Sequence, residues 1–376
     1  MNIKSCFNLF KTAFLFFRLM KKHNFCSGPC ILPSSVYDEA SRGILNFNDS
    51  GLSILEISHR SVAFQEILQG ARNLLKELLQ IPDTHSVLFL QGGASLQFSM
   101  AAMNFSRAES KTAYLDTGRW AKKAFEEAEK LNLAEVIATS VDKNYTYLPE
   151  FFKPLGKFDY LHFTSNNTIY GTQYQEFPSC EIPLIADMSS DILTREIDFS
   201  RFNLIYAGAQ KNIGAAGSAI AIVNKEALNK HGRNIPSYLD YNMHVEEENT
   251  FNTPPVFAIY TAYLNLKWLK NQGGVLAMKQ KSKEKSQLLY NEIDRNSCFR
   301  GTAAKENRSK VNVTFVLENK VHQAEFDEIC QANGIENIKG HRTVGGYRAS
   351  LYNALPIESV QALVNAMQEL EKKINQ

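Results

Sequence analysis

The sequence has few cysteines, and their spacing suits neither a zinc site nor a disulfide framework. Only six occur in 376 residues, and no two form a C-x-x-C pair. Paired cysteines are typical of structural zinc sites and of small secreted domains. We therefore expect reduced thiols, no metal site and a cytoplasmic location. The six are Cys6, Cys26, Cys30, Cys180, Cys298 and Cys330.

The sequence also lacks an excess of one charge. Its formal net charge is +2, and no basic block interleaved with aromatic residues occurs. A nucleic-acid partner is therefore not expected. Apolar residues make up 44% and charged residues 21% of the chain, as in ordinary globular proteins. A chain of 376 residues is long enough for two lobes.

The N-terminal stretch MNIKSCFNLFKTAFLFFRLMKKHNF is apolar but too short to span a membrane. Lys11 and Arg18 interrupt it, and no small-residue cleavage site follows. We expect translation to start at Met20, because MKKHNFCSGP resembles an ordinary protein beginning. A signal peptide and an amphipathic surface helix remain the alternatives.

Short apolar runs alternate with amphipathic stretches from about residue 86. Helical periodicity occurs between several of them, for example in WAKKAFEEAEKL, residues 120–131. This alternation predicts an α/β fold with a mostly parallel sheet covered on both faces. Ligands bind such sheets beyond the carboxyl ends of the strands. The expected strands lie within residues 86–91, 111–118, 134–140, 158–165, 182–190, 202–208 and 218–223.

The last part of the chain has a different succession of expected helices and strands. Long helices are expected over residues 255–269 and 275–293, separated by Gln272-Gly273-Gly274. Beyond them the pattern predicts a smaller α+β lobe, with the boundary near residue 278. Its expected strands lie at 310–318 and 347–353, and its expected helices at 322–334 and 356–373.

One lysine, Lys211, lies between the apolar runs FNLIYAG and SAIAIV, surrounded by glycine and alanine. No carboxylate neighbours it in sequence, and burying a lone ammonium is costly. We expect a tight turn whose small residues let a ligand approach the backbone. A lysine in such a pocket has a lowered pKa and can form a Schiff base with a carbonyl. The alternative is an exposed lysine in a hairpin turn.

A carboxylate follows the neighbouring apolar run. Asp187 follows the run IPLIA, just as Lys211 follows the next run, FNLIYAG, so both come at the carboxyl end of an expected strand. If the two strands are adjacent, both side chains face one crevice. A Schiff-base lysine and a carboxylate for a pyridinium nitrogen are the groups that pyridoxal phosphate (PLP) requires. Taken alone, Asp187 also suits a helix cap or a turn before Ser189 and Ser190.

Two further segments suit a flat, phosphorylated cofactor. VLFLQGGASLQFSM predicts a strand, a Gly92-Gly93 turn and a helix that opens at Ala94-Ser95, where free backbone N–H groups attract an anion. The segment has neither a G-x-G-x-x-G nor a P-loop pattern. Trp120, just after YLDTG, is placed to stack on a ring, although a tryptophan in the core is the commoner arrangement.

Eight motifs in this order resemble those of the phosphoserine aminotransferases, a family of class-V, fold-type I PLP enzymes. The match runs from about Asn24 to the C-terminus. The motifs are SGP, EISHR, the Gly-Gly turn before LQF, YLDTGRWA, ADMSSDILTREID, IYAGAQKNIG, FNTPP and GHRTVGGYRASLYNA.

The resemblance implies a large PLP-binding domain over residues 34–278 with a mostly parallel seven-stranded sheet. A small α+β domain would cover 279–376 and be joined by residues 20–33, leaving 1–19 as an N-terminal extension. Family members generally act as homodimers with shared active sites.

The resemblance also implies site roles. Lys211 would be the Schiff-base lysine and proton shuttle, and Asp187 would bind the pyridinium nitrogen. Trp120 would stack on the ring and Thr168 would bond its hydroxyl. The phosphate would be held by Ala94, Ser95 and Gln210, with Asn252 and Thr253 of the neighbouring subunit. Some members have Gly-Arg in place of Ala94-Ser95, so an arginine contact to the phosphate is missing here.

The implied reaction interconverts 3-phosphohydroxypyruvate plus glutamate with 3-phosphoserine plus 2-oxoglutarate. Use of 4-phosphohydroxythreonine in pyridoxine biosynthesis is a further option. Each substrate carries an α-carboxylate and a distal anion, which arginine's planar fork suits. By resemblance, Arg348 would bind the α-carboxylate. His59, Arg60, His341 and Arg342 would meet the phosphate or the glutamate side chain, although each His-Arg pair alone also suits a solvated surface.

Three other functions compete with this one. A cysteine desulfurase needs a mobile catalytic cysteine, and the late candidates are Cys298 and Cys330. An alanine–glyoxylate aminotransferase would share the cofactor but take different substrates. A non-catalytic binding protein would not need both Lys211 and Asp187.

Overall fold

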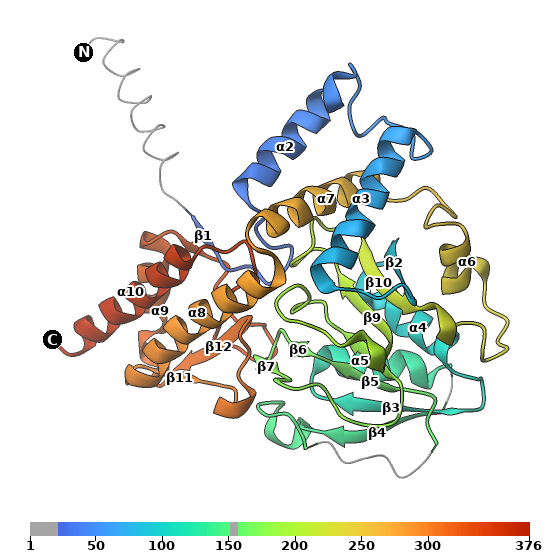
Figure 1. Cartoon of the computed structure of the whole chain (residues 1–376). Coiled ribbons are helices and arrows are strands. Elements are labelled where there is room, and N and C mark those ends of the chain that lie inside the picture. Colours follow the sequence, from blue (N-terminus) through green and yellow to red (C-terminus); the bar gives the residue numbers. More distant parts are fainter. Residues whose placement is uncertain (1–21, 132, 151–156) are drawn as a thin grey trace.

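The structure, a computed structural model, describes residues 22–131, 133–150 and 157–376. It has two lobes, of which the larger surrounds a central sheet and the smaller contains the C-terminus (Figure 1). The expectations for a start at Met20 and for residues 1–19 lie outside the described residues. None of the described helices is long and apolar enough to cross a membrane.

The larger lobe contains a seven-stranded sheet in the order β2-β10-β9-β8-β5-β3-β4. β10 is antiparallel to both neighbours, and the other adjacent pairs are parallel. The predicted mostly parallel sheet is therefore confirmed, and each predicted run overlaps a strand. The strands are β2 His85–Leu90, β3 Lys111–Asp116, β4 Leu133–Thr139, β5 Leu161–Thr164, β8 Leu184–Asp187, β9 Phe202–Gly208 and β10 Ala219–Asn224.

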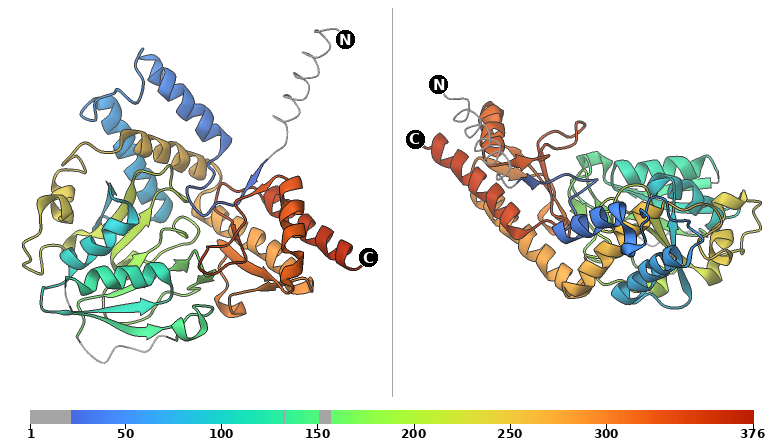
Figure 2. Two further views of the ribbon diagram at one scale, coloured as in Figure 1. Left: turned by 180° about the vertical axis from the view of Figure 1, so that it is seen from behind. Right: turned by 90° about the horizontal axis from the view of Figure 1, so that it is seen from above.

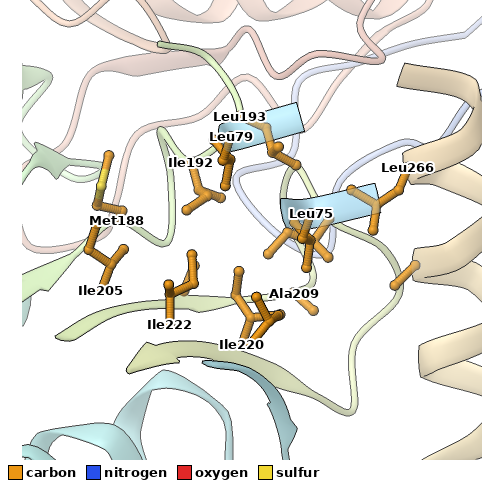
Figure 3. Packing of buried hydrophobic residues seen from close by; sticks show 14 of the residues in the cluster. Leu75, Leu79, Met188, Ile192, Leu193, Ile205, Ala209, Ile220, Ile222 and Leu266 are labelled. Atoms are coloured by element: carbon orange, nitrogen blue, oxygen red, sulfur yellow. The ribbon is translucent and has the colours of Figure 1, made fainter. Parts of the chain in front are cut away.

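Both faces of the sheet are buried, because alternate residues of each central strand enter different clusters. In β10, Ile220 and Ile222 pack toward helices α3 and α7, whereas Ala221 and Val223 pack toward α4 and α5. Figure 3 shows the first of these clusters, in which Met188 and Ala209 extend the packing just beyond β8 and β9. The helices are α3 Val62–Leu79, α4 Gly93–Phe105, α5 Arg119–Glu129 and α7 Val256–Asn271.

The predicted alternation of strands and helices is only partly right. The predicted helices within 120–131 and 255–269 are present as α5 and α7. In the described residues between β4 and β9, however, the connections contain only 3₁₀ turns at Val141–Lys143 and Phe199–Arg201 and a short hairpin of β6 Asn166–Asn167 and β7 Thr172–Gln173. One face is instead covered partly by α3 and α7, which lie outside the run of parallel strands in sequence.

The tight turn predicted around Lys211 is wrong in its length. Ten residues, 209–218, separate β9 from β10, and a bond from Ala209 N–H to the Ser218 carbonyl (3.0 Å) closes this loop. The loop is wide enough to place Lys211 beyond the strand ends.

The smaller lobe combines a three-stranded antiparallel sheet in the order β11-β12-β14 with helices α8, α9 and α10. The predicted α+β pattern is confirmed here. A two-stranded parallel pair, β1 with β13, brings the N-terminal segment to this lobe, and Phe25 lies in its core. The elements are β1 His23–Asn24, α8 Gly274–Arg295, β11 Phe299–Gly301, β12 Asn312–Leu317, α9 Gln323–Ala332, β13 Ile335–Glu336, β14 Tyr347–Ser350 and α10 Ile357–Ile374.

Helix α8 belongs to both lobes, as the view from above in Figure 2 shows. Val275 and Met278 pack in the core of the larger lobe, whereas Leu289 and Ile293 pack in that of the smaller lobe. A boundary at residue 278 thus falls inside a continuous helix, and the division into 34–278 and 279–376 stays a prediction. Two further helices lie on the larger lobe, α2 Ser34–Leu45 and α6 Tyr241–Glu246.

Candidate active site

A cavity of about 280 Å³ opens beyond the carboxyl ends of the parallel strands. Strands β2, β3, β5, β8 and β9 all end toward it, as expected for an α/β sheet. Its lining residues are Ser27, Gly28, Gly93, Ala94, Ser95, Phe98, Trp120, Thr164, Asn166, Thr168, Ile169, Asp187, Ser189, Ser190, Gln210, Lys211, His341 and Arg348.

Lys211 is half-buried in this cavity, and its amine donates to the Thr168 hydroxyl at 3.0 Å. Burial, together with Arg348, lowers the pKa of Lys211 to about 8, although Asp187 and Asp191 oppose the shift. The alternative of a solvent-exposed hairpin lysine is therefore wrong. The amine is neutral in a substantial fraction of molecules near neutral pH, as a nucleophile or base requires.

The loop that carries Lys211 is fixed by buried asparagines. Asn265 of α7 donates to the carbonyls of Asn212 and Ile213, both at 2.9 Å. The Asn212 side chain accepts from the backbone of Asn353 in the smaller lobe at 3.0 Å. Gly214 has room for no side chain, because a Cβ would lie 2.9 Å from the Ala262 backbone. These contacts hold the lysine loop against α7 and tie it to the second lobe.

Asp187 ends β8, next to β9, and its carboxylate is buried at the cavity wall. One oxygen accepts from the Ser189 backbone (2.9 Å) and from the Ser189 hydroxyl (2.6 Å). Burial raises the pKa of Asp187, while Ser189 and Lys211 act in the opposite direction. A cation beside this carboxylate would be strongly stabilised, because little water competes for it.

The Gly92-Gly93 turn opens α4 toward the cavity. Both glycines have positive φ, +82° and +62°, and a Cβ on Gly93 would meet only open space. Backbone N–H groups in the first turn of a helix lack intrahelical partners, so those of residues 93–95 are available to an anion. Ala94, Ser95 and Gln210, which the family resemblance implies as phosphate ligands, line the same cavity, and that role stays a prediction.

Three of the predicted aromatic and cationic residues line the cavity, and the others do not. Trp120, Arg348 and His341 line the cavity. Arg348 donates to the Ser27 hydroxyl at 2.6 Å, and burial lowers its pKa. Burial and nearby arginines lower the pKa of His341, whose Nδ1 lies 2.7 Å from the Thr343 hydroxyl.

The other predicted residues lie outside the cavity in a single chain. Arg60 and Arg342 are exposed, and the His59 backbone carbonyl accepts from Gln65. Asn252 and Thr253 precede α7 and contact each other, with the Thr253 carbonyl accepting from Gln91 at 2.8 Å. A role for these five at the site needs a second subunit or a rearrangement, so their roles stay predictions.

Sequence reasoning gave no role to several polar residues of the cavity. Ser27 precedes Gly28, where a Cβ would lie 3.4 Å from the Gln210 side chain and 3.5 Å from that of Lys211. Asn166 donates to the Ser190 hydroxyl (2.9 Å) and to Asn312 of the smaller lobe (2.7 Å). The motifs SGP and ADMSS already contained Ser27 and Ser190, but nothing in their spacing places them beside Lys211.

The chain matches the family model "Aminotransferase class-V" over residues 23–363. It is 54% identical over 356 residues to the phosphoserine aminotransferase of Flavobacterium johnsoniae, covering 94% of this chain and 100% of the relative. The corresponding protein of Bacteroides thetaiotaomicron is 52% identical over 355 residues, covering 94% and 99%. The chain belongs to the phosphoserine aminotransferase family.

Solved structures of this family share the fold. A phosphoserine aminotransferase structure from a study of radiation damage to its Schiff base has a TM-score of 0.92 at 43% identity. The match covers 94% of this chain and 100% of that chain. A PLP-bound phosphoserine aminotransferase from Trichomonas vaginalis has a TM-score of 0.87 at 37% identity, covering 93% and 100%.

The cavity of this family member fits PLP. A buried amine of lowered pKa, a buried carboxylate and an open helix N-terminus suit the aldehyde, ring nitrogen and phosphate of PLP, respectively. Ala94-Ser95 at that terminus provides backbone N–H groups and one hydroxyl, without an arginine. Among the described residues, no cluster of ligands for a metal ion occurs.

Proposed function

We propose that the protein transfers an amino group between glutamate and 3-phosphohydroxypyruvate, giving 3-phosphoserine and 2-oxoglutarate. The reaction belongs to serine biosynthesis. The observation that carries the proposal is the Lys211 amine, which lies in one cavity with Asp187 and Arg348 and has its pKa lowered to about 8. Relatives that are about 50% identical over nearly the whole chain are named phosphoserine aminotransferase.

Lys211 is the proton carrier of the proposed reaction. Its amine takes the proton from the substrate α-carbon and later returns one, so the neutral and charged forms must both be accessible. The lowered pKa of Lys211 meets this requirement. The free amine of Lys211 is oriented by the hydrogen bond that it donates to the Thr168 hydroxyl at 3.0 Å.

Bound PLP supplies the electron-withdrawing ring that accepts the electron pair left by the α-proton. Asp187 holds the proton on the ring nitrogen, which strengthens that electron withdrawal. Ser189 fixes the Asp187 carboxylate through two hydrogen bonds, so its position does not depend on the substrate. Trp120 would cover the ring, and the N-terminus of α4 would hold the phosphate.

Arg348 binds the α-carboxylate of either amino acid. Its guanidinium is partly withdrawn from water, which strengthens the pairing with a carboxylate. His341 lines the same cavity. We assign the distal phosphate or carboxylate to His341, Arg342, His59 and Arg60.

The proposed active unit is a cytoplasmic homodimer. Asn252, Thr253, His59 and Arg60 do not line the cavity of their own chain. A two-fold dimer would supply them from the partner, which is the arrangement that the family resemblance implies.

The rival cysteine chemistry finds no support in the described residues. Cys330 is buried in α9, and burial raises its pKa to about 12. Cys298 lies in the smaller lobe and does not line the cavity. Cys30 lies near Lys211, but its thiol donates to the Lys211 carbonyl at 2.8 Å and burial raises its pKa to about 12. A desulfurase needs a reactive thiolate, which none of these provides.

Paired assays test the function. Purified protein should bind PLP and convert phosphoserine plus 2-oxoglutarate, but not alanine plus glyoxylate. Equal activity with the second pair would refute the proposed substrate. A second assay with 4-phosphohydroxythreonine tests the additional role in pyridoxine biosynthesis, which we propose because this substrate has the same phosphate and α-carboxylate.

A further inference from the structure

A second cavity, of about 510 Å³, lies between the lobes. It shares no lining residue with the active-site cavity. One wall is a face of α8, where residues 276, 279, 280 and 283 recur at helical spacing. The opposite wall comes from residues 173–176 and 194–196 of the larger lobe and from Lys310, which precedes β12.

The second cavity carries an excess of positive charge. Two lining carboxylates, Glu176 and Glu196, face four cations, and the buried Asp191 lies 3.9 Å from one of them, Arg195, which leaves one positive charge in excess. The cations are Arg195, Lys279, Lys283 and Lys310.

Two of these lysines have no ion-pair partner among the described residues. Lys279 pairs with Glu196 at 3.0 Å, but within the described part of the chain Lys283 and Lys310 form no ion pair. Burial and the surrounding cations Arg195, Lys279 and Lys283 lower the pKa of Lys310, although Glu176 opposes the shift. The repulsion among these cations is therefore only partly offset, and an anionic ligand would relieve it further.

A buried hydroxyl at the same wall also lacks a partner. Ser282 is 3% exposed and lines the cavity, yet its Oγ makes no hydrogen bond. A buried, unpaired hydroxyl is costly, and most such groups in proteins find a partner. Ser286, one turn further along α8, is also buried, but its hydroxyl donates to the Lys283 carbonyl at 3.0 Å. Ser282 therefore has a free donor where the cationic groups converge.

We propose that this cavity is a second binding site for a small organic dianion, with Lys283 and Lys310 as its charge partners and Ser282 as its hydroxyl donor. The two negative charges of such a ligand would each have one of the two lysines that form no ion pair as a partner. Phosphate monoesters and dicarboxylates share this chemistry. Gln173 of the larger lobe accepts from the Lys310 backbone at 2.9 Å, which holds Lys310 at the junction of the lobes.

Calorimetric titration of the PLP-loaded enzyme tests the site. The titrants are glycerol 2-phosphate, succinate and inorganic phosphate, which separate a phosphate monoester from a dicarboxylate and from a free ion. The test variant is Lys283→Gln with Lys310→Gln. The matched control is Lys281→Gln with Lys320→Gln, which removes the same charge from lysines outside the cavity.

We expect at least one organic titrant to bind the wild type and the control equally, and the test variant at least tenfold more weakly, as for the loss of charged hydrogen bonds. Ser282→Ala should also weaken binding, whereas Ser286→Ala should not. The KM for phosphoserine should stay unchanged, which shows that the active site is intact. Equal binding to the two lysine variants, or binding of inorganic phosphate alone, would overturn the proposal.

Discussion

At the scale of single residues, the chemistry depends on how Lys211 is held. Its amine reaches Thr168, its loop is anchored by Asn265, and Asp187 lies at the end of the adjacent strand. Each of these contacts affects either the position or the pKa of one nitrogen atom.

Lys211→Ala should abolish transamination without unfolding the protein. Proton transfer by a placed side chain alone accounts for about 10²–10⁴-fold in rate, and the covalent attachment of PLP is lost as well. Steady-state assays and thermal unfolding, with Lys225→Ala on the exposed turn after β10 as the control, provide the measurement. Activity near that of the control would refute the assignment of Lys211.

Covalent attachment of PLP to the apoprotein should depend on pH through the pKa of Lys211. Because burial lowers that pKa to about 8, the neutral fraction should fall about tenfold per pH unit below 8 and level off above it. Stopped-flow absorbance measures the rate, and Nα-acetyl-lysine run in parallel corrects for the ionisation of PLP. A rate that still climbs steeply between pH 9 and 10.5 would indicate an ordinary lysine.

Arg60→Leu tests the distal-anion assignment. Loss of one charged hydrogen bond should weaken both phosphoserine and glutamate by roughly 1.5–3 kcal/mol. Values of kcat/KM for the two substrates provide the measurement, and alanine, which has no distal anion, serves as the internal control. An equal loss for alanine would contradict the role.

At the scale of helices, strands and loops, the sequence predicted the elements that have strong internal patterns. The seven apolar runs each overlap a strand, and α5 and α10 show clear helical spacing. The loop of ten residues around Lys211 was not predictable in length, because its shape depends on the distant Asn265 and Asn353. Helix α3 was not predicted. It buries Phe64, Ile67 and Leu75 against partners that are remote in sequence.

In the candidate site too, residues near strand ends were predictable, whereas residues brought in from distant segments were not. Residues at a strand end or in the helix that follows it, such as Asp187 and Trp120, are recognisable because strand ends of a parallel sheet meet at one edge. Ser27 reaches the cavity through its bond with Arg348, 321 positions away in sequence, which no local pattern encodes.

Asn265→Ala should destabilise the link between α7 and the lysine loop. It leaves the buried carbonyls of Asn212 and Ile213 without a donor, which costs about 1–3 kcal/mol. Urea unfolding of this variant should be compared with that of Asn271→Ala, at the exposed end of the same helix. A free energy of unfolding equal to that of the control would show that the two bonds contribute nothing.

At the scale of the whole molecule, the remaining question is which chain completes each site. Lys211 lines the cavity of its own chain, whereas Thr253 does not. Two inactive variants, Lys211→Ala and Thr253→Glu, distinguish a shared site from a private one.

If the sites are shared, a mixed dimer collects both defects in one site and leaves the other intact. Random exchange should then restore about a quarter of the sites. Activity is measured after mixing under conditions that allow subunit exchange, with each variant alone as the control. No recovery despite verified exchange would remove Thr253 from the shared site.

The placement of β10 also determines the order in which the sheet is built. β2 is an edge strand, and its one neighbour in the sheet is β10, which is made about 130 residues later. A chain emerging from the ribosome therefore carries the apolar segment His85–Leu90 without a sheet partner until Ala219–Asn224 has been synthesised. For that interval the first half of the protein presents an unpaired strand, which is a natural binding target for a chaperone.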